Sequence, residues 1–212
     1  MSFISGFFHN DEDGKQRRRS RQQERYATFR DILYIFVIFL LVYMLLFRIV
    51  DVDGASMNNT LYDGDRLLLV SNLIYRNPQQ GDIVVASKDS FRNGESIIKR
   101  VIATEGQWID IDFDTGVVYV GDSKETLQPL QEDYILNLTQ LYEGVHFPLQ
   151  VAEDCVFVMG DNRMNSKDSR DPSIGMIDQR EILGKVLFLL IPSDPDGHGP
   201  QTAQWSRIGW MG

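Results

Sequence analysis

The stretch Ser96-Ile97-Ile98-Lys99-Arg100-Val101-Ile102-Ala103 is the clearest guide to the fold of this chain. Its β-branched residues predict a buried β-strand. The pair Asn93-Gly94 precedes it, and both residues tolerate the positive φ of a tight turn. The apolar run at residues 82–86 lies before that turn, so we expect the two runs to form a hairpin. Lys99 is then either a solvated strand residue or an amine buried among Ile and Val.

Further short apolar runs extend this pattern in both directions along the chain. Asp114-Thr115-Gly116 marks a second hairpin, and Pro192 ends the last long run. Many short runs with Gly and Asn turns, and few helical periods, indicate an all-β domain. We therefore predict a mainly β fold, an antiparallel sheet or a barrel-like domain. The expected strands are residues 50–53, 66–70, 82–86, 96–103, 107–112, 117–120, 155–159 and 182–191.

Residues 32–47 carry no charge and predict a membrane-spanning helix. Extended to Val50, a helix of this length covers roughly 28 Å, about one hydrocarbon core. A buried core helix is rarely apolar on every side. A cleavable signal peptide has an apolar region of only about 7–15 residues. Of the three interpretations we favour a retained single-pass anchor at residues 31–50.

The charges on the two sides of this segment predict its orientation. Seven basic residues and one acidic residue lie between Lys15 and Arg30, whereas 13 basic and 25 acidic residues follow from Ile49 onward. The positive-inside rule places residues 1–30 in the cytoplasm as a flexible tail and residues 51–212 outside the plasma membrane. The acidic bulk argues against nucleic acid as a partner. Trp205 and Trp210 near the end of the chain either dock on the domain or touch the bilayer.

Cysteine and histidine limit the chemistry that the chain can carry out. Cys155 is the only cysteine, so no internal disulfide can form, and its apolar neighbours indicate a core residue rather than a nucleophile. One Cys, and no His pair at ligand spacing, give no sign of a metal site or of another cofactor. Of the histidines, His9 is predicted to be cytoplasmic and His198 lies in a Gly/Pro-rich tail, while His146 stays open as a general base.

Ser56 is the candidate nucleophile, in the stretch Gly54-Ala55-Ser56-Met57-Asn58-Asn59-Thr60-Leu61. A serine hydroxyl needs a neighbouring base to take its proton as it attacks. Lys99 can be that base if its amine is neutral. The ordinary pKa of lysine, ~10.4, must then fall to about 7. Burial among Ile97, Ile98 and Val101 would lower it, because desolvation disfavours the charged form.

Four blocks of sequence, in this order after one anchor, resemble the type I signal peptidases, which are membrane-anchored Ser/Lys proteases. The short anchor and Gly54 are similar to the Gram-positive branch. Two positions depart from the family pattern: Asn59 stands where Pro is usual, and residues 103–107 replace a Gly-x-Pro-Gly-Asp type turn. The blocks are Gly54-x-Ser56-Met57-x-x-Thr60-Leu61, Gly81-Asp82-Ile83-Val84-Val85, Lys99-Arg100-Val101-Ile102 and Gly160-Asp161-Asn162-Arg163-x-x-Ser166-x-Asp168-Ser169-Arg170.

The resemblance implies a role for each part of the site. The Ser166 hydroxyl would hydrogen-bond and orient Lys99, and the backbone N–H of Ser56 would contribute to the oxyanion hole. A charge network would support them, formed by Asp161, Arg163, Asp168 and Arg170. The substrates would be signal peptides of secreted preproteins, cleaved after a small-x-small motif such as Ala-x-Ala at the outer face of the lipid bilayer.

Substrate binding is expected to occur by strand addition beside the segments that precede Ser56 and Lys99. Shallow pockets would admit Ala and exclude larger side chains, because overfilling a rigid pocket is costly. The substrate-binding residues predicted from this are Val52, Asp53, Met57, Ile97 and Ile98.

Two other functions remain as alternatives. The Asn59 departure suggests a catalytically inactive relative, a membrane chaperone or assembly factor that keeps the peptide groove. A self-cleaving Ser/Lys protein of the repressor type is disfavoured by the anchor and by the lack of a DNA-binding region. The presence of both Ser56 and Lys99 favours the enzyme.

Overall fold

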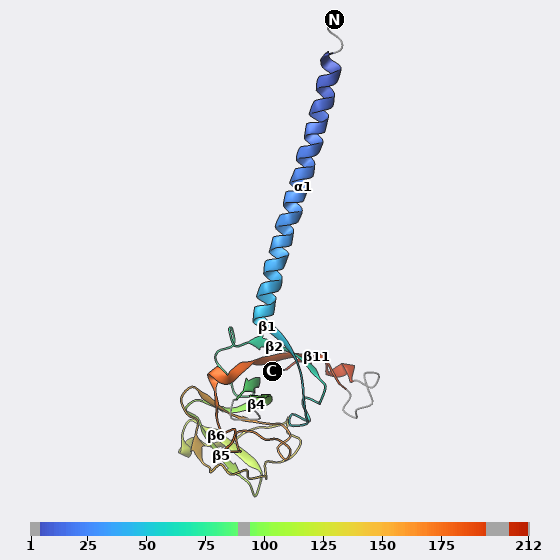
Figure 1. Ribbon diagram of the computed structural model, residues 1–212. Coiled ribbons are helices and arrows are strands. Elements are labelled where there is room, and N and C mark those ends of the chain that lie inside the picture. The colour runs from blue at the N-terminus through green and yellow to red at the C-terminus, as the bar shows by residue number, and fades with distance from the viewer. Residues whose placement is uncertain (1–4, 89–93, 194–203, 212) are drawn as a thin grey trace. The chain divides into compact units, whose positions relative to one another are not determined.

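The computed structural model describes residues 5–88, 94–193 and 204–211, and for residues 5–23 it describes only the backbone. The chain divides into two compact units, residues 1–45 and residues 46–212. The first is a helix and the second holds all the described strands (Figure 1). The predicted turn residue Asn93 lies outside the described residues.

The helix α1 runs from Ser5 to Leu46. Its segment Glu24–Leu46 has a mean hydropathy of 2.3 and is long and apolar enough to cross a membrane, by length and composition. The helix begins at Ser5, so it includes most of residues 1–30, which we expected to form a flexible tail. No Pro interrupts it, and Gln, Glu and Arg, which are frequent there, are good helix formers.

The helix ends four residues before the expected limit of the anchor at Val50. Residues Phe47–Asp51 form strand β1 instead, which pairs antiparallel with β2, Arg66–Ser71. In this register Asp51 lies opposite Arg66, and their side chains form an ion pair at 2.7 Å. The uninterrupted apolar run predicted that the helix would continue to Val50. The pairing of residues 47–50 with β2 makes them a strand instead.

The second unit contains two antiparallel sheets. The first follows the order β1-β2-β11-β3-β4-β9-β10, with β12 also on β11, and the second follows β7-β6-β5-β8. Each order runs from one edge strand to another, so the mainly antiparallel β fold is confirmed, and the described strands form no closed barrel. The remaining strands are β3 Ile83–Ser87, β4 Ser96–Thr104, β5 Trp108–Asp112, β6 Val117–Gly121, β7 Gln128–Pro129, β8 Leu149–Gln150, β9 Cys155–Met159, β10 Ile177–Asp178, β11 Ile182–Ile191 and β12 Gly209–Trp210. Short 3-10 helices are η1 Lys124–Thr126, η2 Gln179–Glu181 and η3 Trp205–Arg207.

Strand β4 joins the two halves of the first sheet. Its residues Ser96–Arg100 pair with β3, and Arg100–Thr104 pair with β9. On its β9 side, therefore, the segment 96–99 has no partner strand within the described residues. This leaves a free strand edge beside Lys99.

Apolar clusters on the two faces of this sheet hold β4 in place. Ile97 and Val101 pack into one cluster with Val84. Ile98 packs at the edge of another cluster, which contains Met57 from the Ser56 loop. Because side chains alternate along a strand, these clusters lie on opposite faces. The Ser56 loop is thus packed against the same sheet that carries Lys99.

The end of the chain docks on the domain. β12 pairs with β11, and the Trp210 ring meets Phe188 edge-on at 5.5 Å. Met211 packs at the cluster that contains Met57. Trp210 nevertheless keeps 77% of its surface exposed. Trp210 therefore docks on the domain, which was the first of the two alternatives expected for the tryptophans.

Candidate active site

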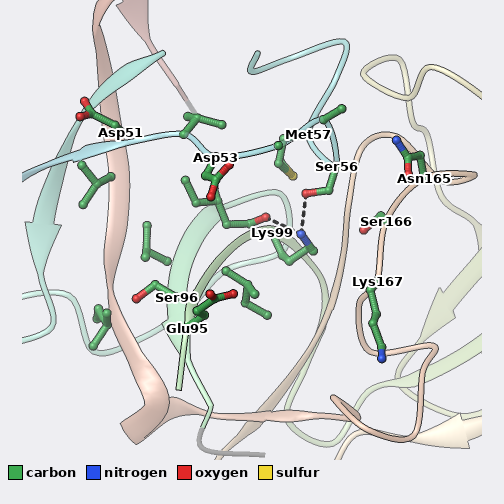
Figure 2. Close-up of a pocket in the computed structure, with 18 of the residues that line it drawn as sticks. Asp51, Asp53, Ser56, Met57, Glu95, Ser96, Lys99, Asn165, Ser166 and Lys167 are labelled. Carbon is green, nitrogen blue, oxygen red and sulfur yellow. Dashed lines mark hydrogen bonds between the residues drawn. The ribbon is translucent and has the colours of Figure 1, made fainter. Parts of the chain in front are cut away.

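The side chains of Ser56 and Lys99 meet although 43 residues separate them in the sequence. The Lys99 Nζ lies 2.7 Å from Ser56 Oγ and 2.9 Å from the backbone oxygen of Ile98 (Figure 2). A distance of 2.7 Å is within hydrogen-bond reach, as direct proton transfer between a nucleophile and its base requires.

Lys99 is buried, with 4% of its surface exposed. Burial lowers the pKa of Lys99 to about 8, although the nearby carboxylates of Asp168 and Asp161 act in the opposite direction. Within the described residues no carboxylate forms an ion pair with this amine. A substantial fraction of Lys99 is therefore neutral at mildly alkaline pH, as a general base must be.

The turn that carries Ser56 is fastened by the loop after β9. The backbone N–H of Asn162 donates to the oxygen of Ser56 at 3.0 Å, and its side-chain amide donates to the oxygen of Ala55 at 3.1 Å. Gly160 makes this close approach possible, since a Cβ there would lie 2.5 Å from the Ser56 oxygen. No hydrogen bond within the described part of the chain uses the N–H of Ser56, which leaves that donor available.

Ser166 lines the same pocket as Lys99, but its hydroxyl is engaged elsewhere. It donates to Asp168 at 2.8 Å, and no hydrogen bond joins it to Lys99 among the described residues. This differs from the expected contact between the Ser166 hydroxyl and Lys99. The carboxylate of Asp168 is the stronger acceptor, since a charge-assisted hydrogen bond exceeds a neutral one.

Asp168 is the centre of a buried ionic network. The Arg170 guanidinium donates to both of its oxygens, at 2.8 and 2.9 Å, and the N–H of Gly160 donates at 2.9 Å. Burial alone would raise the pKa of Asp168, but the hydrogen bonds and charge of Arg170 keep it below its ordinary value. Both members of this pair are fully buried. The pair therefore fixes the loop that contains Ser166.

Two further buried arginines are paired in the same manner. Arg100, the neighbour of Lys99 on β4, holds Asp161 at 2.9 and 2.7 Å. Arg163 forms an ion pair with Glu132 and donates to Thr139 at 2.6 Å. The charge network expected from Asp161, Arg163, Asp168 and Arg170 thus consists of separate pairs rather than one cluster, and it draws in Arg100 and Glu132.

A pocket of about 650 Å³ opens at the Ser56 hydroxyl. One wall is the segment before Ser56, and the facing wall is the start of β4 (Figure 2). Leu141, Glu143 and the loop 164–167 line the remaining side. Every residue predicted to bind substrate lines it: Val52, Asp53, Met57, Ile97 and Ile98.

The other candidate groups from the sequence lie elsewhere. His146 forms a hydrogen bond with the Tyr142 hydroxyl at 3.2 Å and does not line the pocket. Cys155 is half-buried on β9, where burial raises the pKa of its thiol. Among the described residues, no group of three or more His, Cys, Asp or Glu side chains is arranged to hold a metal ion.

Sequence reasoning gave no role to several residues that shape the site. Gly160 and Asn162 lie inside the block at 160–170 that resembles the family, and this position is the signal that could have indicated them. Arg100 could have been identified from strand alternation, which directs it away from its neighbour Lys99. Glu132 and Glu143 lie in a long irregular segment with no motif, and nothing in the sequence connects them to the site.

Comparison with known proteins identifies the family. A family model for signal peptidases, peptidase S26, matches residues 25–191. A probable signal peptidase I-1 of Synechocystis sp. is 35% identical over 166 residues, 74% of this chain and 74% of the relative. Signal peptidase I of Bacillus licheniformis is 29% identical over 186 residues, 84% of this chain and 95% of the relative. The protein in the crystal structure of a signal peptidase I from Enterococcus faecalis V583 is 27% identical to this chain, and the match covers 51% of this chain and 96% of that one with a TM-score of 0.34.

The family match spans most of the chain and includes the loop of Ser56, strand β4 and the loop after β9. The chain belongs to the signal peptidase I family, peptidase S26, and is a serine peptidase.

Proposed function

We propose that this protein is an endopeptidase that removes signal peptides from preproteins with Ser56 as nucleophile and Lys99 as general base. The observation that carries the proposal is the 2.7 Å contact between Lys99 Nζ and Ser56 Oγ. This contact indicates catalysis because the Lys99 amine is buried and forms no ion pair with a carboxylate within the described residues. A buried lysine without a carboxylate in an ion pair is costly to stability, and such groups are concentrated at catalytic sites.

The reaction begins with attack of Ser56 Oγ on the scissile carbonyl carbon while Lys99 Nζ takes the hydroxyl proton. The N–H of Ser56 stabilises the oxyanion that forms. The tetrahedral intermediate collapses as the C–N bond breaks, and the Lys99 ammonium gives its proton to the leaving amine. Water then attacks the acyl-enzyme with Lys99 again as base, which releases the signal peptide and restores the Ser56 hydroxyl.

The substrate lies extended between the two walls of the pocket. The free edge of β4 at residues 96–99 offers backbone groups for strand addition, and the segment before Ser56 offers a second edge. Among the residues that line the pocket, Val52 and Met57 are buried and Ile98 is half-buried. They leave shallow space that suits Ala, so cleavage follows a small-x-small motif such as Ala-x-Ala.

The apolar segment of α1 anchors the enzyme in the plasma membrane. Residues 1–30 lie in the cytoplasm, and the catalytic domain, residues 51–212, lies at the outer membrane–water interface. The basic cluster before the anchor and the acidic composition after it support this orientation. Enzyme and preprotein then share one membrane, which raises their effective concentration.

The test is cleavage of an Ala-x-Ala preprotein by the full chain in detergent. We expect Ser56→Ala and Lys99→Ala each to abolish turnover and to retain the β-sheet circular dichroism of the parent. Ser123→Ala and Lys124→Ala make the same chemical changes at the N-cap and the first residue of η1, away from the pocket, and both variants should cleave like the parent. Turnover retained in either site variant would refute the dyad.

One observation favours an inactive membrane chaperone or assembly factor: Asn59 stands where the family usually has Pro. The loop around this residue is nevertheless ordered by backbone bonds, since both Thr60 and Leu61 donate to the Met57 oxygen at 2.9 Å. The same assay separates the two functions. Binding of preprotein by the parent enzyme without any cleavage would favour the chaperone.

A further inference from the structure

The segment 52–54 beside the nucleophile is fastened along one edge only. Val52 donates to the Asp65 oxygen at 2.8 Å and accepts from the N–H of Gly64 at 2.8 Å. The N–H of Gly54 donates to the Asp63 carboxylate at 2.8 Å. Since successive residues of an extended chain direct their backbone groups to opposite sides, the N–H and C=O of Asp53 face away from this loop.

The side chains of the segment alternate as well. Val52 is 5% exposed and packs with Met57, whereas Asp53 is exposed and lines the pocket. Figure 2 shows Asp53 on the wall next to Ser56, with Glu95 and Ser96 on the facing wall. The carboxylate of Asp53 therefore lies on the opposite face of this segment from the buried side chain of Val52.

The charge of Asp53 differs from that of the other carboxylates around the pocket, because no partner neutralises it within the described residues. Asp51 is paired with Arg66 at 2.7 Å, and Glu143 lies 3.3 Å from Arg170.

The cations of the pocket do not compensate Asp53 either. Lys99 is buried beside Ser56, and Lys167 lies 3.3 Å from Asp171. Arg48 precedes Val52 by four residues on the same strand path, so alternation places it on the face opposite Asp53. The solvent face of the segment before Ser56 is therefore acidic.

An extended peptide also alternates its side chains. If the two small residues of the small-x-small motif point toward Val52 and Met57, the middle residue points to the face of Asp53. On the basis of the function proposed above, we propose that Asp53 selects this middle residue by charge, favouring Lys or Arg over Asp or Glu. The effect falls on the residue for which the shallow pockets provide no selection.

The size of the effect follows from Coulomb's law at an exposed site. Opposite unit charges about 4 Å apart in water change a rate or binding constant by about fivefold. We therefore expect kcat/KM to rise about fivefold for Lys over Gln at the middle position, and to fall about fivefold for Glu. At 1 M salt the Debye length is about 3 Å, so both ratios should approach one.

The experiment measures kcat/KM for three versions of one preprotein, Ala-Lys-Ala, Ala-Gln-Ala and Ala-Glu-Ala, with the full chain in detergent. Asp53→Asn should bring the Lys/Glu ratio near one, and Asp53→Lys should invert it. Asp122→Asn, which makes the same change of net charge away from the pocket, should keep the ratio of the parent.

The outcomes separate this proposal from the proposed function. Cleavage of all three substrates by the parent with equal kcat/KM would overturn charge selection and leave the peptidase intact. The same Lys preference in parent and Asp53→Asn would also overturn the assignment to Asp53. Failure of the parent to cleave any of the three would overturn both proposals.

Discussion

Lys99 and Arg170 are both buried cations within one site, but their surroundings differ. Arg170 donates two hydrogen bonds to Asp168, and the pair is fully buried. Lys99 has a serine hydroxyl and a backbone oxygen as its partners. The first arrangement compensates the buried charge, whereas the second does not.

The difference shows how one fold separates support from reactivity. Arginine stays protonated at any pH that a protein tolerates, so a buried arginine with a carboxylate is a permanent structural pair. Lysine can lose its proton, and burial without a paired carboxylate lowers the pKa of Lys99 to about 8. The arginine pairs hold the loops in place, and in the proposed mechanism Lys99 remains free to act as a base.

The largest expected effect comes from making Lys99 resemble its arginine neighbours. Lys99→Arg keeps a cation at the site, but a guanidinium cannot accept the Ser56 proton. We expect kcat to fall by about 10⁴-fold or more, the range seen when a catalytic nucleophile–base pair loses one member. Single-turnover cleavage of the preprotein measures this. Activity within tenfold of the parent would mean that positive charge, not a free base, is what the site needs.

Removing one partner of the buried pair between Asp168 and Arg170 should destabilise the protein. Asp168→Asn leaves the buried Arg170 without its carboxylate, and removing one partner of a buried pair costs about 3–5 kcal/mol. Urea unfolding of the full chain in detergent measures the loss. Asp51→Asn, which disrupts the exposed pair with Arg66, is the control and should change stability little. An Asp168→Asn variant as stable as this control would contradict the supporting role of the pair.

Much of the domain could be predicted from sequence because local patterns sufficed. The hairpin turn at Gly116, which adopts a φ of +75°, and the apolar runs of β4 and β9 were recognisable from residue type alone. The meeting of Ser56 and Lys99 required the family resemblance, since no local rule joins residues 43 positions apart. The prediction was wrong at residues 47–50. Their apolar side chains predicted a continued helix, but these residues pair with β2 and form part of strand β1.

Other contacts could not be predicted because several acceptors competed. Ser166 was expected to bond to Lys99, yet Asp168 lies two residues away and offers a charged oxygen. Glu143 reaches Arg170 from a segment without regular structure. Such choices depend on distances that only the folded chain fixes.

A smaller effect should distinguish Lys99 from the arginines through pH. Because the folded pKa of Lys99 is about 8, below the unfolded value of ~10.4, its ammonium destabilises the fold below pH 8. This destabilisation decreases as the pH rises from about 8 and is almost absent at about 10.4. Lys99→Met should therefore stabilise the protein by about 3 kcal/mol at pH 7 and by almost nothing near pH 10.4. Urea unfolding at both pH values measures the difference, and equal stabilisation at the two would contradict a depressed pKa.

The central claim is that a neutral Lys99 amine takes the proton of Ser56. The pH dependence of kcat/KM for one Ala-x-Ala preprotein tests it most directly, since this parameter reports the free enzyme. We predict a rise of tenfold per pH unit up to a midpoint at about pH 8, followed by a plateau. A midpoint near 10.4, the ordinary value for lysine, or near 6.5, that of histidine, would contradict the account.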